Sequence, residues 1–76
     1  MPIRLVEAEK VELPHEVLLL PDEENRGFRR VILTSRILDE KGGVVEVDGR
    51  EAMSRQMIGV DPHKIVELAR PVSDWP

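Results

Sequence analysis

Proline and glycine residues divide this chain of 76 residues into short segments. Proline removes a backbone N–H donor and glycine weakens the interior of helices and strands, so both tend to mark turns or the ends of elements. They stand at Pro14, Pro21, Gly27, Gly42, Gly43, Gly49, Gly59, Pro62 and Pro71. This spacing excludes long helices and predicts a fold built from short elements.

The first part of the chain has the pattern of short strands. Residues 3–13 alternate apolar with acidic side chains, which predicts a strand with one polar face. The alternation slips between Glu9 and Val11, and Pro14 argues against a central position in a sheet. We therefore expect an edge strand with a bulge, or two short pieces. The apolar run at 17–20 predicts a brief, buried strand.

Residues 28–40 fit two different elements. The apolar positions there have helical spacing, and Gly42 would suit the end of such a helix. The segment is also rich in β-branched residues, which favour strands. Lys41, Gly42 and Gly43 form a suitable loop before the apolar strand predicted at 44–47. We therefore predict a β-hairpin and keep the helix as the alternative.

A first short helix is predicted over residues 51–58. Asp48 and Gly49 precede it as a tight turn or as the entry to the helix. Met53 and Met57 lie at helical spacing, so this prediction places both side chains against the core.

A second short helix is predicted over residues 62–70. Asp61 would be its N-cap, and Pro62 would occupy the first helical position, where its missing donor is not needed. The β-branched residues near its start favour the competing interpretation, a closing strand over 64–70.

Together these elements predict an α+β fold, with a small antiparallel sheet of three or four short strands and two short C-terminal helices. We expect residues 1–71 to form a single domain and residues 72–76 to form a tail. A domain of this size has a small core, and without cysteine it has no disulfides to support it. A bound partner or self-association would bury further apolar surface and so add to the stability of the domain.

The chain is expected to be soluble and cytoplasmic. Its longest uninterrupted apolar run, at 17–20, has four residues, whereas a helix that crosses a bilayer needs about 20. The first residues also lack the basic, apolar and small-residue order of a signal peptide. We therefore expect no contact with membranes.

The net charge of −4 conceals two segments of opposite sign. Residues 1–24 hold two basic and seven acidic side chains. Residues 25–36 hold no acidic side chain and four arginines, which are Arg26, Arg29, Arg30 and Arg36. The acidic total argues against non-specific binding to nucleic acid, which depends on many basic side chains.

The arginine segment supports three interpretations. Arginine matches carboxylates and phosphates, so these side chains together with Phe28 could bind an anion or an acidic partner. A basic strand that begins with an aromatic residue also has the general form of a sheet that contacts RNA, which makes a small nucleic-acid-binding domain the alternative function. In the third interpretation, the acidic segment lies beside the arginines and neutralises them.

The sequence contains no recognisable catalytic constellation and implies no cofactor. Gly42 and Gly43 lack the lysine and hydroxyl residue of a phosphate-binding loop. His15 and His63 have no second histidine at helical or strand spacing, so we predict no metal site from spacing alone. Asp61 and His63 would need a third ligand from elsewhere, and a metal-binding or catalytic accessory protein is therefore a further alternative.

Trp75 is the remaining residue that we expect to contact a partner, because tryptophan is enriched in interface hot spots. Its other interpretation is a tail side chain that lies on the edge of the core. The leading hypothesis is a small non-catalytic interaction or regulatory module that forms a homodimer or accompanies a larger protein.

Overall fold

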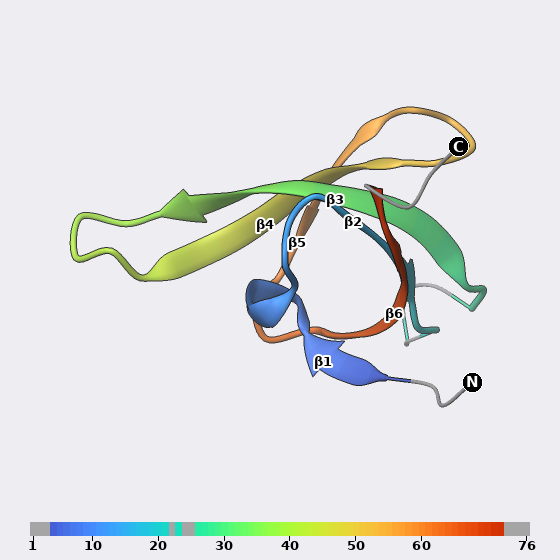
Figure 1. Ribbon diagram of the computed structural model, residues 1–76, viewed down its shortest axis with the longest axis horizontal. Coiled ribbons are helices and arrows are strands. Elements are labelled where there is room, and N and C mark those ends of the chain that lie inside the picture. Colours follow the sequence, from blue (N-terminus) through green and yellow to red (C-terminus); the bar gives the residue numbers. More distant parts are fainter. Residues whose placement is uncertain (1–3, 22, 24–25, 73–76) are drawn as a thin grey trace.

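The chain forms a six-stranded antiparallel sheet with the strand order β1-β6-β2-β3-β4-β5. A computed structural model describes residues 4–21, 23 and 26–72. Figure 1 shows the sheet curled, with the tip of the β3–β4 hairpin extending away from the other strands. A 3₁₀ turn, η1 (Ala8–Lys10), follows the first strand. The strands are β1 (Leu5–Glu7), β2 (His15–Leu19), β3 (Arg29–Leu38), β4 (Val44–Glu51), β5 (Met57–Val60) and β6 (Ile65–Pro71).

The predicted α+β class is wrong, because neither C-terminal helix is present. Residues 51–58 complete β4, make a turn and begin β5. Met53 and Met57, which were expected to contact the core, are 87% and 70% exposed. Helical spacing of a few apolar residues is a weak signal in a short segment, and here pairing with β4 satisfies the backbone instead.

The predicted helix at 62–70 is also wrong, and the competing strand agrees with β6. β6 lies between β1 and β2, and its Val66 is fully buried. Asp61 caps a turn rather than a helix, since its carboxylate accepts the His63 N–H at 2.8 Å. The β-branched residues therefore follow their preference for a half-buried sheet surface.

The predicted hairpin is confirmed by β3 and β4, which pair in antiparallel register. Gly42 has a φ of +82°, which suits glycine at the turn. The Asp39 Oδ1 atom accepts the N–H groups of Lys41 at 2.9 Å and Gly43 at 2.8 Å. Asp48 and Gly49, expected to form a turn or a helix entry, continue β4 instead.

The N-terminal expectations hold in outline. β1 is an edge strand followed by η1, so the described residues 4–13 of the predicted strand form short pieces rather than one long strand. The strand predicted at 17–20 is β2, which begins earlier and lies between β6 and β3 in the sheet. The longer β2 brings His15 and Glu16 into the sheet as well.

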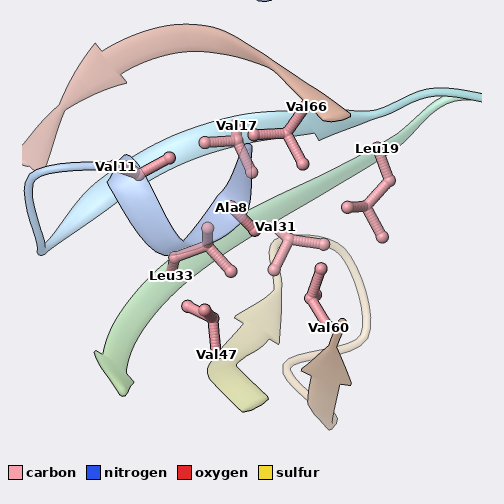
Figure 2. Close-up of a cluster of buried hydrophobic side chains, with 9 residues drawn as sticks. All are labelled: Ala8, Val11, Val17, Leu19, Val31, Leu33, Val47, Val60 and Val66. Atoms are coloured by element: carbon pink, nitrogen blue, oxygen red, sulfur yellow. The ribbon is translucent and has the colours of Figure 1, made fainter. Parts of the chain in front are cut away.

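The core is aliphatic and mostly valine. Its side chains come from η1 and its flank and from β2 to β6, and Figure 2 shows them facing one another. No helix in the described part of the chain is long and apolar enough to cross a bilayer. The buried hydrophobic residues are Ala8, Val11, Val17, Leu19, Val31, Leu33, Val47, Val60 and Val66.

Candidate functional site

Two of the predicted arginines form ion pairs within the chain. The Arg29 guanidinium contacts the Glu51 carboxylate of β4, with its Nε atom 3.1 Å from Oε2. Arg30 Nε lies 3.6 Å from Glu16 Oε1 on β2, and the Glu16 side chain is buried although it is charged. These carboxylates reduce the net positive charge that β3 presents to a ligand.

Arg36 has a structural role, because it joins β3 to the chain around η1. Its Nε atom donates to the Glu9 carbonyl oxygen at 3.0 Å, and its Nη2 atom donates to the Val11 carbonyl oxygen at 2.5 Å. These donors are therefore already used within the fold.

Arg26 and Phe28, two further predicted contact residues, lie outside the strand that carries these three arginines. Arg26 and Phe28 are exposed just before β3, and the Phe28 side chain is 63% exposed. Trp75 lies outside the described residues. The acidic N-terminal segment contributes Glu16 to the arginines of β3, as the neutralisation interpretation expects, whereas Glu51 comes from a different part of the chain.

Strand β5 presents a surface that the sequence reasoning missed. In the described part of the chain it pairs with β4 alone, so its other edge carries unpaired backbone groups. Met57–Val60 contains no charged residue and no proline, which are the usual means of protecting an edge strand. The exposed Met57 side chain adds apolar surface to this edge. Such an edge is suited to pairing with another strand.

The two ends of β5 have neighbours of opposite charge. At its beginning Met57 lies opposite Arg50, and the Arg50 Nη1 atom is 3.5 Å from the Arg55 carbonyl oxygen. Further along, Gly59 lies opposite Asp48. Arg50 and Asp48 are two residues apart in β4 and so project from the same face of the sheet. The edge therefore has a basic end and an acidic end.

Glu46 strengthens the acidic end. A Cβ atom on Gly59 would lie 2.5 Å from Glu46 Oε1, so the Glu46 carboxyl extends over β5. A hydrogen bond with Asp48, together with repulsion from its charge, raises the pKa of Glu46 above its ordinary value. We call Glu46 and Asp48 the acidic pair. An arginine brought close to this pair would relieve its mutual repulsion.

The basic end of β5 borders a hollow of about 340 Å³. Arg50 and Arg55 both line it, and Arg55 has a left-handed backbone with a φ of +61°. The other lining residues are Ile32, Glu51 and Ala52. The lining of this hollow thus combines two apolar residues with two arginines and one glutamate.

The two histidines lie in different surroundings. His63 approaches Glu7 and Glu9, which supply the further ligands that the sequence alone did not place beside it. Asp61 is committed to the His63 backbone N–H. His15 lines a separate cavity of about 240 Å³, where its Nε2 atom is buried without a hydrogen-bond partner in the described structure.

Comparison with known proteins finds no match for this chain among protein-family models, curated proteins or solved structures.

Proposed function

We propose that this chain is a small non-catalytic interaction module that self-associates by antiparallel pairing of β5 with β5 of a second copy. The observation that carries the proposal is the uncharged edge of β5 with Arg50 beside one end and the acidic pair beside the other. A second copy of the chain offers the complement of this surface.

Two-fold symmetry explains why the partner is a second copy. When two identical strands pair antiparallel, the beginning of each lies beside the end of the other. Arg50 of each copy then approaches the acidic pair of its partner, so both ends of the interface join opposite charges. Burying Met57 from both copies adds apolar contact, which benefits a chain with a small core.

The other edge of the sheet is less suited to this pairing. β1 has only three residues, and one of them is the charged Glu7. It leads directly into η1, whose turn interrupts the extended backbone. Strand addition at β5 therefore has the stronger structural basis.

Introducing a charged side chain on the exposed edge of β5 tests the proposal. The measurement is sedimentation velocity over a range of protein concentrations. We expect the unmodified chain to form a dimer at high concentration and Met57→Lys to weaken dimerisation at least about tenfold, because lysine on an edge strand opposes further pairing. Leu38→Lys is the matched control, since Leu38 is an apolar residue exposed on the β3–β4 hairpin. A chain that stays monomeric up to millimolar concentration, or a dimer lost only in Leu38→Lys, contradicts the proposal.

A charge exchange tests the antiparallel arrangement itself. Arg50→Glu makes both ends of β5 acidic, and Asp48→Lys reduces the acidity of the other end, so each variant alone is expected to dimerise about tenfold more weakly. An equimolar mixture of the two should form a heterodimer, because the altered ends are then complementary. If the mixture dimerises no more strongly than either variant alone, antiparallel pairing of β5 with β5 is excluded.

A further inference from the structure

Three ionisable side chains from separate segments converge beside the turn between β5 and β6. Glu7 ends β1, Glu9 belongs to η1, and His63 lies in the turn. His63 Nδ1 is 3.5 Å from Glu7 Oε2 and 3.7 Å from Glu9 Oε1. All three ligand atoms lie within 4.8 Å of one another. The group thus combines one nitrogen donor with two carboxylates.

The backbone holds these residues together. The Ala8 N–H donates to the Lys64 carbonyl oxygen at 2.8 Å, and the Glu9 N–H donates to the Pro62 carbonyl oxygen at 2.9 Å. Both bonds join the Glu7–Glu9 region directly to the residues on either side of His63. Ala8 and Pro62, which belong to the two joined segments, are both buried. The approach of the three side chains is therefore a consequence of the fold.

The turn that carries His63 is fixed as well. The Asp61 carboxylate accepts the His63 N–H at 2.8 Å, and the Asp61 carbonyl oxygen accepts the Lys64 N–H at 3.0 Å. Glu7 pairs with Ile65 in the β1–β6 register, so the strand after the turn is anchored beside the first carboxylate. Little ordering would be needed for a ligand to engage all three side chains.

From this geometry we infer that Glu7, Glu9 and His63 bind a divalent transition-metal ion, with Zn²⁺ as the best match. Tetrahedral zinc with ligand bonds of about 2.0–2.2 Å separates its ligands by about 3.4 Å, close to the two distances from His63. The ion would also neutralise the repulsion between the two carboxylates. The His63 side chain is 73% exposed, which leaves room for water as a fourth ligand.

The nitrogen donor determines which ion the group prefers. Mg²⁺ and Ca²⁺ take oxygen ligands, whereas imidazole favours zinc and its neighbours in the transition series. We therefore expect Zn²⁺ to bind at least a hundredfold more tightly than Mg²⁺. This inference is independent of the pairing through β5.

Calorimetric titration of the tag-free full chain with zinc chloride tests the site. We expect one Zn²⁺ per chain, and at least tenfold weaker binding in both His63→Gln and Glu9→Gln. The matched controls are His15→Gln, which removes the other histidine, and Glu12→Gln, which removes an exposed carboxylate near the site in sequence. Both controls should bind as the unmodified chain does. No saturable binding, or equal binding in all the variants, overturns the inference.

Proton NMR of the unmodified chain supplies a second measurement that does not depend on variants folding. Stoichiometric Zn²⁺ should shift the ring resonances of His63 and leave those of His15 in place. Shifts confined to His15, or no change in either ring, would contradict the assignment of this site.

Discussion

Gly49 lies in β4 where the backbone of β3 passes very close to it. A Cβ atom at this position would be 2.3 Å from the Ile32 carbonyl oxygen and 3.0 Å from Leu33 Cα. The obstructing atoms belong to the backbone, so no side-chain rotation relieves the contact. Glycine in a strand interior marks such a close approach as readily as it marks a turn.

Gly49→Ala is therefore expected to destabilise the fold by about 1–3 kcal/mol, the usual range for inserting atoms into a packed site. Chemical denaturation followed by circular dichroism measures this change. Gly27→Ala is the matched control, because no heavy atom of the described structure lies within 4 Å of its added Cβ. Equal stability of the two variants would show that β3 and β4 separate without cost.

At the scale of elements, η1 depends on a side chain from a distant strand. Arg36 of β3 donates to two carbonyl oxygens that border η1, those of Glu9 and Val11. The sequence placed this arginine in a basic, partner-binding segment. Its actual role could not be predicted locally, because its acceptors are 27 and 25 residues away.

Arg36→Met keeps a long apolar stem and removes both donors. We expect it to lower the free energy of unfolding by about 1–3 kcal/mol, since the Val11 carbonyl oxygen at a partly buried site and the more exposed Glu9 carbonyl oxygen both lose their donor. Arg26→Met, in the exposed segment before β3, should change stability by less than about 0.5 kcal/mol. Guanidinium denaturation measures the free energy of unfolding of both variants. If Arg36→Met leaves this free energy unchanged, the hydrogen bonds from Arg36 to the chain around η1 do not stabilise the fold.

The C-terminal elements show where local pattern was insufficient. Pro62 lies in the turn before β6 and Pro71 ends that strand, whereas Gly59 lies inside β5 rather than at its limit. The β-branched residues near Ile65 favoured the strand that is present. The spacing of Met53 and Met57 nevertheless suggested a helix. Their exposure, together with the pairing of β5 to β4, shows that strand partners rather than local spacing decided the outcome.

At the scale of the whole molecule, stability depends on one small aliphatic core. Leu33 is fully buried and lies among side chains from several strands, as Figure 2 shows. A domain of this size has only a few kcal/mol of net stability from its core. A single substitution that truncates a large side chain in this core should therefore destabilise the whole fold.

Leu33→Ala is expected to cost about 2–5 kcal/mol, the range for truncating a buried leucine, and so to unfold much of the population at 25 °C. Leu38→Ala, at an exposed site further along the same strand, should cost less than about 0.5 kcal/mol. Thermal melting monitored by circular dichroism distinguishes them. A melting curve for Leu33→Ala that matches that of Leu38→Ala would place the core elsewhere.

The sequence by itself determined the short elements, the β3–β4 hairpin and the edge position of the first strand. These features follow from proline, glycine and alternation, which act over a few residues. Tertiary structure decided that β6 is a strand, because its partners β1 and β2 come from distant segments, and β5 is a strand because it pairs with the preceding strand β4. It also brought His63 to Glu7 and Glu9 and placed opposite charges at the two ends of β5, since both arrangements depend on which strands become neighbours.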